Sequence, residues 1–366
     1  MGVRDDVAAF SGSYRAARAA FLAAAQAAGL AVQSHVHPLT GLDGEELALD
    51  VVRDGPADAT AMLVVSSGCH GVEGYCGSGV QVAALRDVTW RAQLRTSGVA
   101  VLYLHALNPW GFSWRCRVTH ENADLNRNFQ DFSQPLPANP GYDELHPFLV
   151  PAQWPPDAAA EAGVADFVAR NGMTGLQAAV SRGQHRHPDG LFFGGTAPTW
   201  SNQTIRAILR AECAGVRRLG WIDIHTGLGP SGHGERIFAD HDNAVALARV
   251  RDWWARDGAT VTSVYDGSST SAVLTGMLFH GVRDECPQAE YTGMALEYGT
   301  HPVMVVMHAL RASNWLNQHP EAPAEQAAAI RQLVLDGFYT QTDDWKRQIL
   351  TQAAQAMEQG VRGLAG

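Results

Sequence analysis

Two residues of the segment GCHGVEG, His70 and Glu73, have the spacing of a metal-binding pair. An imidazole nitrogen and a carboxylate at this spacing can both bind one zinc ion. The pair follows an apolar run at 61–67 with the pattern of a buried strand, and open α/β sheets bind ligands at strand ends. Chance alone gives roughly half a His-x-x-Glu pair in a chain of this composition, so a polar turn stays an open interpretation.

A second candidate ligand, His225, lies in the apolar run GWIDIH at 220–225. This run is typical of a buried strand, in which alternate side chains share a face. Trp221, Asp223 and His225 are therefore expected on one face, with the histidine near the strand end. A zinc ligand is one interpretation of His225, and a hydrogen-bonded core histidine is the other.

Glu297 closes another apolar run, GMALEY at 293–298. A carboxylate at the end of such a strand must be paired, belong to a site or face the solvent. Beside a metal, it could serve as a general base.

Cationic and amide side chains gather in RCRVTHENADLNRNF, which contains Arg117, Asp124, Asn126 and Arg127. A guanidinium group matches the geometry of a carboxylate, so Arg127 and Asn126 could bind an anionic substrate group. A helix start with a solvated arginine is the alternative. Taken together, a His/Glu/His set, a carboxylate base and two arginines match metal-assisted hydrolysis with an open position for water.

The elements that must position these residues alternate along the chain. Strands are expected at 31–36, 46–53, 61–67, 99–104, 220–225 and 293–298, and helices at 7–28, 79–86, 157–170, 200–215, 303–316, 323–336 and 342–358. This order predicts an α/β fold, with a mixed, mostly parallel twisted sheet flanked by helices. The proline-rich stretch at 105–160 is expected to be a long, functional loop.

The domain organisation follows from the spread of these motifs. They run from 70 to 297 without a repeat or linker, which favours one catalytic domain over 1–366. The N-terminal helix at about 7–28 and the C-terminal helices at about 303–358 are expected to pack on it.

Composition excludes several classes of function. The 366 residues carry a net charge of −10, which gives no support for a nucleic-acid or anionic-membrane partner. Five cysteines without a CxxC motif argue against disulfides and a thiolate zinc site. The alanine-rich stretch at 19–28 is expected to be an amphipathic helix ending at Gly29 rather than a signal peptide. The expected location is therefore the cytoplasm.

The ordered motifs HGVEG, NPWGF, DLNRNF, DIHTGLG and LEYGT resemble those of the zinc metallocarboxypeptidases (funnelins), in particular a bacterial subfamily of unassigned function. The resemblance spans 70–300. It is shared by the aspartoacylase and succinylglutamate desuccinylase branch of the same clan, towards which DIHTG and LEYG lean.

The resemblance implies a role for each motif residue. His70, Glu73 and His225 would bind one Zn²⁺ ion, and Glu297 would be the general base that activates its water. Arg117 would stabilise the oxyanion of the tetrahedral intermediate.

The same resemblance assigns the surrounding residues. Asn126 and Arg127 would hold the terminal carboxylate of the substrate. Asp124 would hydrogen-bond the far nitrogen of His70 and fix its tautomer. The implied activity is hydrolysis of an amide bond next to a free carboxylate, as in a carboxypeptidase acting on small peptides.

Departures from the peptidase pattern leave alternatives open. Trp110 replaces an aspartate, Thr119 replaces an asparagine, and the segment SAVLTGML at 271–278 lacks the mobile tyrosine of the peptidases. An N-acyl amino acid deacylase and a non-catalytic carboxylate-binding relative are the two alternatives. A serine or cysteine hydrolase using Ser78 or Cys76 is disfavoured because no G-x-S-x-G motif is present.

Overall fold

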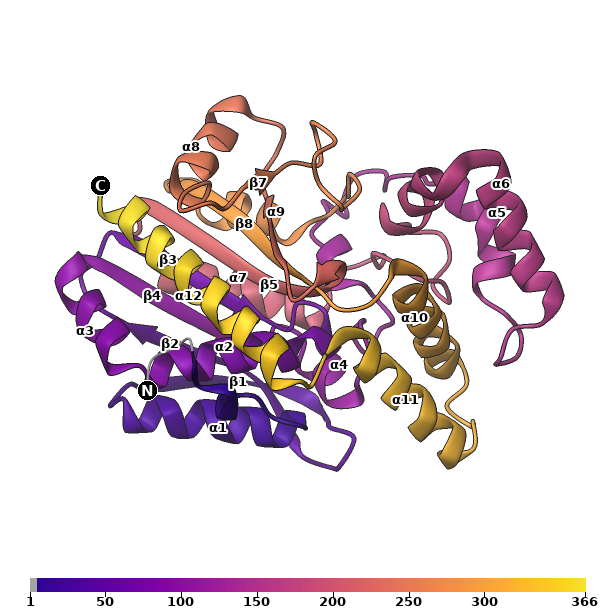
Figure 1. The fold of residues 1–366 in the computed structure, drawn as a ribbon, viewed down its shortest axis with the longest axis horizontal. Coiled ribbons are helices and arrows are strands. Elements are labelled where there is room, and N and C mark those ends of the chain that lie inside the picture. The colour runs from indigo at the N-terminus through magenta and orange to yellow at the C-terminus, as the bar shows by residue number, and fades with distance from the viewer. Residues whose placement is uncertain (1–4) are drawn as a thin grey trace.

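An eight-stranded sheet lies at the centre of the computed structural model, which describes residues 5–366 (Figure 1). The strands follow the spatial order β1-β2-β4-β3-β5-β8-β6-β7. The pairs β4/β3, β3/β5, β5/β8 and β6/β7 are parallel, and the other three are antiparallel. The expected α/β fold with a mixed, mostly parallel sheet is confirmed.

The strands are β1 (Val32–Thr40), β2 (Glu46–Asp54), β3 (Ala61–Ser67), β4 (Val99–His105), β5 (Arg218–Ser231), β6 (Gly234–Phe238), β7 (Val261–Thr262) and β8 (Glu290–Gly299). The α-helices are α1 (Tyr14–Ala27), α2 (Gly74–Arg86), α3 (Val88–Ser97), α4 (Pro109–Trp114), α5 (Pro140–Leu149), α6 (Ala158–Ser181), α7 (Trp200–Glu212), α8 (Ala244–Trp254), α9 (Leu278–Glu285), α10 (Val303–Gln318), α11 (Ala324–Phe338) and α12 (Asp343–Ala365). Short 3-10 helices are η2 (Val7–Ala9), η3 (Gly71–Glu73) and η4 (Leu125–Arg127).

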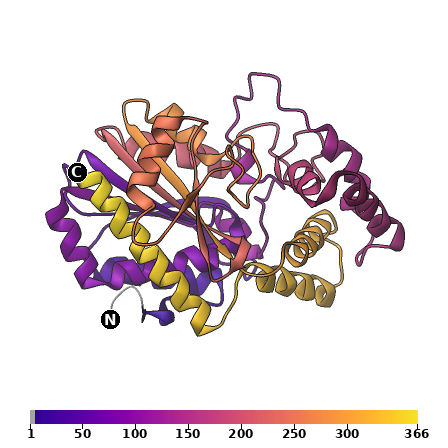
Figure 2. The ribbon, with the colours of Figure 1, turned by 45° about the horizontal axis from the view of Figure 1, so that its top comes forward.

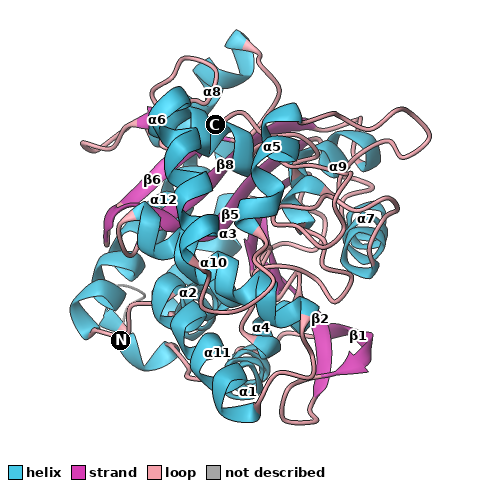
Figure 3. Cartoon of the chain, turned by 90° about the vertical axis from the view of Figure 1, so that its right-hand side faces the viewer, coloured by secondary structure: helices cyan, strands magenta, loops and turns pink. Residues whose placement is uncertain are grey.

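Alternate side chains of the central strands enter two different cores. In β3, Leu63 and Val65 belong to one core, and Met62 and Val64 belong to the other. This alternation follows from the two-residue period of a strand, and it explains why a run such as AMLVVSS is apolar throughout. Helices α1, α2 and α12 pack into the first core, and α7 and α9 pack into the second, so the sheet has helices on both sides (Figure 3).

Four helices, α5, α6, α10 and α11, lie together beyond one end of the sheet (Figures 1 and 2). The buried guanidinium of Arg311 in α10 joins three of them. It donates to the carbonyl of Phe148 in α5 at 2.9 Å and pairs with Glu161 in α6 at 2.8 Å. In α11, the carbonyl of Phe338 accepts a 2.7 Å hydrogen bond from Thr226 in β5, which ties the group to the sheet.

The N-terminal region and the glycine-rich segment differ from the sequence expectation. The helix expected at 7–28 is divided into η2 and α1, and α1 ends at Ala27, just before Gly29 with its φ of +71°. Helix α2 begins at Gly74 rather than 79, because packing outweighs the low helix propensity of glycine. A Cβ on Gly77 would lie 2.5 Å from the Cβ of Ser67, so only glycine lets the helix approach β3 this closely.

The stretch expected to be a long loop at 105–160 contains two helices, so that expectation is wrong in part. Both helices begin with an Asn-Pro pair: Asn108 precedes α4 and Asn139 precedes α5. Each asparagine caps its helix by accepting from a backbone N–H, and each proline occupies the first helical position, where it is favoured. The elements α3, β6, β7, α8 and α9 were not expected from the sequence.

All five cysteines are buried and free. Within residues 5–366, no helix is long and apolar enough to cross a membrane.

Replacing Gly77 with alanine tests the close packing of α2 on β3. The added methyl overpacks the contact with Ser67, so we expect Gly77→Ala to lower the free energy of unfolding by about 1–3 kcal/mol. Gly215→Ala is the control, because a Cβ at that position meets no atom within 4 Å. Urea denaturation measures both. If Gly77→Ala were as stable as the wild-type protein or more stable, the contact between α2 and β3 would not require glycine at position 77.

Candidate functional site

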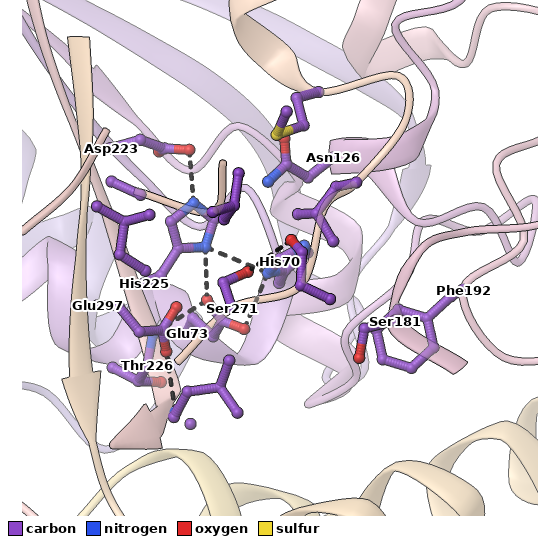
Figure 4. Close-up of a pocket in the computed structure, with 18 of the residues that line it drawn as sticks. His70, Glu73, Asn126, Ser181, Phe192, Asp223, His225, Thr226, Ser271 and Glu297 are labelled. Atoms are coloured by element: carbon purple, nitrogen blue, oxygen red, sulfur yellow. Dashed lines mark hydrogen bonds and ion pairs between the residues drawn. The ribbon is translucent and has the colours of Figure 1, made fainter. Parts of the chain in front are cut away.

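Three buried side chains, His70, Glu73 and His225, converge where β3 ends beside the longer strand β5, in which His225 lies near the middle rather than at the expected strand end (Figure 4). Glu73 bridges the two rings: its Oε1 lies 2.9 Å from His70 Nδ1, and its Oε2 lies 2.9 Å from His225 Nδ1. The two Nδ1 atoms are 3.3 Å apart. Ligand atoms of a tetrahedral zinc site are about 3.3 Å apart for bonds near 2 Å, so this donor set fits zinc.

A chain of hydrogen bonds that passes through Ser66 on the neighbouring strand β3 holds His225 in place. His225 Nε2 lies 2.7 Å from Asp223 Oδ2, and Asp223 Oδ1 accepts from Ser66 Oγ at 2.6 Å. Trp221 Nε1 in turn donates to Ser66 Oγ at 2.7 Å. The expected common face of Trp221, Asp223 and His225 is confirmed. The sequence analysis assigned no role to Asp223, which orients the ring so that Nδ1 faces the other donors.

His70 and Glu73 are positioned by η3, which is pressed against α4. A Cβ on Gly71 would lie 2.0 Å from the carbonyl carbon of Gly111, so the two backbones touch directly. The N–H of Gly71 donates to the carbonyl of Arg117 at 3.0 Å, which ties η3 to the next functional segment. The glycines of HGVEG and NPWGF are therefore required by this close approach.

Asp124 and Arg117 surround the far side of His70. Asp124 Oδ1 lies 3.2 Å from His70 Nε2, and Asp124 Oδ2 accepts from Arg117 Nε at 2.9 Å. Arg117 also donates to Glu73 Oε1 at 3.2 Å and places Nη2 only 2.7 Å from His70 Nε2. A carboxylate and a cation thus compete for one ring nitrogen.

The buried charges shift one another's protonation. Burial alone would raise the pKa of Glu73, but the two histidines outweigh it and hold that pKa below its usual value. Burial alone would lower the pKa of His225, but the carboxylates of Asp223 and Glu73 raise that pKa well above its usual value. Arg117 and Arg127 likewise outweigh burial and keep the pKa of Asp124 low. The cluster therefore favours anionic carboxylates beside cationic groups. A bound dication can supply the same positive charge next to these carboxylates.

A second donor set shares His225 and consists of Cys69, Asp223 and His225. Burial raises the pKa of the Cys69 thiol well above its usual value, so the thiolate that a metal needs is disfavoured. Both oxygens of Asp223 already bond to Ser66 and His225. This set fits a metal less well than the first.

Glu297 lies beside His225, because the two residues are direct partners in the parallel β5/β8 register. Its Oε1 accepts from the N–H of Leu228 at 3.0 Å, where β5 bulges out of the ladder. Its Oε2 has no hydrogen-bond partner in residues 5–366, and the side chain lines the pocket. Burial and the nearby Glu73 raise the pKa of Glu297 to about 8. The carboxyl group is therefore placed to exchange a proton.

Asn126 and Arg127 line the same pocket but differ in availability. Asn126 Oδ1 accepts from the N–H of Leu278 at 2.9 Å, and its amide nitrogen has no partner in the described chain. Arg127 is buried and donates from Nε and Nη2 to the carbonyl of Ser181 and from Nη1 to that of Asn126. Burial lowers the pKa of Arg127 to about 10, which shows how incompletely its charge is compensated.

Phe192 is a site residue that the sequence analysis did not assign. The centroid of its ring lies 4.9 Å from the guanidinium carbon of Arg117 and 5.5 Å from that of Arg127, so the ring contacts both cations. Its φ of +52° is rare for a bulky residue. The loop between α6 and α7 therefore contributes to the pocket through Phe192, whereas Phe193 is buried outside the pocket lining.

Every candidate residue from the sequence analysis is brought to one place. His70, Glu73, Arg117, Asn126, Arg127, His225 and Glu297 line one pocket, and Asp124 lies behind His70 and Arg117. The tyrosine-free segment at 271–278 also lines it, with Ser271, Ala272, Leu274, Met277 and Leu278.

The sequence matches the profile of a family described as "Protein of unknown function (DUF2817)" over residues 10–352. The chain belongs to the DUF2817 family. No curated protein matches this DUF2817 sequence.

The fold of the DUF2817 chain is similar to that of solved carboxypeptidases. The crystal structure of carboxypeptidase A from Helicoverpa armigera is 12% identical, with a TM-score of 0.51 over 97% of this chain and 73% of that one. At this identity the similarity shows the fold alone, and it confirms the expected carboxypeptidase-like architecture.

Two further solved structures are more distant. A metallo-carboxypeptidase from Pseudomonas aeruginosa, in complex with (2-guanidinoethylmercapto)succinic acid, is 13% identical, with a TM-score of 0.46 over 94% of this chain and 68% of that one. A succinylglutamate desuccinylase from Silicibacter sp. TM1040 is 11% identical, with a TM-score of 0.39 over 80% and 66%.

Zinc titration tests the donor set. We expect one Zn²⁺ per chain, loss of stoichiometric binding in His225→Ala, and about 10–100-fold weaker binding in Asp223→Asn, which replaces the carboxylate that orients the ring with a neutral amide that has one acceptor oxygen for two partners. Metal analysis and competition titration measure this.

His146→Ala is the matched control for that titration. His146, His187 and Asp189 also lie close together, but the two rings stack at 4.0 Å with an interplanar angle of 20°, so their lone pairs do not converge. Unchanged zinc binding in His225→Ala, or a loss in His146→Ala, would contradict the assignment.

Proposed function

We propose that this DUF2817 protein is a zinc-dependent hydrolase that cleaves an amide bond next to a free carboxylate. The observation that carries the proposal is Glu297, whose free Oε2 faces a pocket shared with the three donors and with Asn126. The substrate is a small peptide or an N-acyl amino acid, since both contain an amide next to a carboxylate. One catalytic domain would carry the whole site.

The donor set defines where a zinc ion would be held. His70, Glu73 and His225 would bind one ion, with Asp124 and Asp223 fixing the two imidazole rings. When bound, zinc makes water more acidic and polarises a carbonyl group. The protein's own side chains would carry out the proton transfer and bind the substrate.

Glu297 would move the proton. Its free Oε2 accepts a proton from the attacking water and returns it to the leaving nitrogen, so the amine departs neutral. The N–H of Leu228 holds the other oxygen, which fixes the carboxyl orientation through both transfers.

Arg117 would stabilise the negative charge that develops on the carbonyl oxygen. If His70 gave its Nδ1 to the metal, the ring would carry its proton on Nε2 and donate it to Asp124. That proton would repel the nearby Nη2 of Arg117 and leave this donor available to the substrate.

Asn126 and Arg127 would hold the substrate carboxylate and so select which bond is cut. The amide nitrogen of Asn126 is free, and the buried charge of Arg127 attracts an anion. Arg127 is fixed by the carbonyl groups of Asn126 and Ser181, which would hold the substrate carboxylate at a constant place in the pocket.

Removing the proton acceptor tests the mechanism. We expect Glu297→Gln to retain zinc and to lower kcat about 10²–10⁴-fold, because the amide cannot accept the proton. Product release from short peptides and N-acyl amino acids, followed by mass spectrometry, measures this. Glu290→Gln, an exposed change at the start of the same strand, is the control. Full activity of Glu297→Gln would refute the role of Glu297.

A charge reversal tests the carboxylate site. Asn126→Asp keeps an oxygen for the N–H of Leu278 but sets an anion against the substrate carboxylate. We expect kcat/KM for the carboxylate substrate to fall about 10–100-fold. The matching carboxamide should lose far less. An equal loss for both substrates would place the substrate carboxylate elsewhere.

A further inference from the structure

Away from the metal donors, the side chains that line the pocket are mainly apolar. It has a volume of about 260 Å³, and its buried walls include Trp221, Ile237, Phe238 and Met294. The charged side chains among its lining residues all belong to the site described above. The rest of the pocket therefore offers no charge to pair with a charged substrate group.

Two helices carry this apolar wall outwards. On α10, Val303, Val306, Met307 and Leu310 line the pocket at the spacing of one helix face. On the other side, α6 is kinked at Gly172, where φ is +72°, and the half that follows turns Met173, Leu176 and Gln177 into the lining. The helices α6 and α10 thus face each other across the pocket mouth.

The mouth exposes apolar side chains that a folded chain normally buries. Met173 is 44% exposed, Val303 is 42% exposed and Met304 is 48% exposed, although all three line the pocket. Pro302 and Val305 are exposed too, so the first turn of α10 is an apolar run in solvent. Such runs and patches mark binding surfaces, because water penalises them unless a ligand covers them.

A second cavity lies behind the exposed side chains of the mouth. Leu176, Met304 and Met307 also line this cavity of about 150 Å³ between α6 and α10, whose other walls include His308 and the ion pair of Glu161 and Arg311. The two methionines form part of the wall between the cavities, and methionine side chains adapt easily to a new neighbour. An apolar group is therefore accommodated on the methionine side of this wall, and the charged part of the second cavity lies beyond it.

Polar groups at the mouth are few and partly committed. Gln177 donates from its amide nitrogen to the carbonyl of Thr270 at 2.6 Å, which joins α6 to the loop before α9. The carbonyl of Ser181 already accepts from Arg127. Thr174 and Ser271 are the other polar residues of this part of the lining, so a peptide backbone laid here would find few partners for its N–H and C=O groups, whereas an alkyl chain needs none.

We propose that the pocket accepts N-acyl amino acids whose acyl group is a long alkyl chain, and that this chain lies along the apolar mouth between α6 and α10. This inference rests on the proposed amide hydrolase function. Water is added across the amide: the C–N bond breaks, a C–O bond forms, and a fatty acid and a free amino acid are released. The buried apolar walls favour an apolar amino acid.

A chain-length series tests the proposal with the zinc-loaded protein. The substrates are N-acetyl-, N-hexanoyl- and N-decanoyl-phenylalanine, below their micelle concentrations, together with the peptide Ala-Ala-Phe. Each buried methylene is worth about a two- to fourfold gain in binding. We expect kcat/KM to rise at least 100-fold from acetyl to decanoyl and to exceed that of the peptide. A flat series, or a preference for the peptide, would overturn the proposal.

Two variants locate the chain. Met304→Asn should reduce the decanoyl-to-acetyl ratio of kcat/KM at least tenfold, because it puts an amide into the alkyl path. Val88→Asn, a change at a 74% exposed valine on α3, should leave that ratio unchanged. An unchanged ratio in Met304→Asn would also contradict the proposal.

A binding measurement separates this inference from the proposed function. Calorimetry with Glu297→Gln compares the affinity for the acetyl and decanoyl compounds without turnover. Tighter decanoyl binding with no hydrolysis by the wild-type protein supports the apolar subsite and refutes the hydrolase. Hydrolysis without chain-length dependence supports the hydrolase and refutes the apolar subsite. Binding of neutral lipid vesicles without chain-length dependence would assign the apolar mouth to a membrane surface and overturn the proposal.

Discussion

The carboxylate of Glu73, 1% exposed, lies between two imidazole rings at 2.9 Å from each. A charge in that position is costly to bury, and only its neighbours make it tolerable. Because β3 ends beside Ile224 of the parallel strand β5, His70 and His225 reach Glu73 from two segments far apart in sequence. Removing either imidazole would leave the charge of Glu73 less compensated in an interior of low dielectric constant.

Polar and apolar surfaces are separated within the pocket. The charged groups gather at the strand ends, and the walls formed by α6, α9, α10 and β6 are largely apolar. Interactions among the charges are stronger there than in water, because apolar walls exclude solvent. The same walls give the substrate a surface for apolar groups. The separation of charged and apolar residues in the pocket thus strengthens the interactions of the charged groups and also provides an apolar surface that selects the substrate.

The sequence predicts much of the fold because buried strands are the clearest signals in it. The runs at 61–67, 99–104, 220–225 and 293–298 all correspond to strands of the sheet. The ends of the strands also explain why the candidate residues meet. Short or edge elements such as β7 were not predictable, because their pairing depends on distant neighbours.

Other features of the site depend on contacts that sequence patterns do not reveal. The role of Asp223 requires the cross-strand pairing with Ser66, which appears only when β3 and β5 are in register. Phe192 could not be assigned, because its contact with two arginines depends on a left-handed backbone turn in a loop. The start of α2 was missed because its glycines are selected by close packing rather than by helix propensity.

The most direct test is a crystal structure of the Glu297→Gln protein with zinc and an N-acyl amino acid, with anomalous data at the zinc edge. The account predicts one zinc peak bound by His70 Nδ1, His225 Nδ1 and Glu73. It also predicts the substrate carboxylate at Asn126 and Arg127, with the amide beside residue 297. A zinc peak at other ligands, or a carboxylate bound away from Asn126 and Arg127, would contradict it.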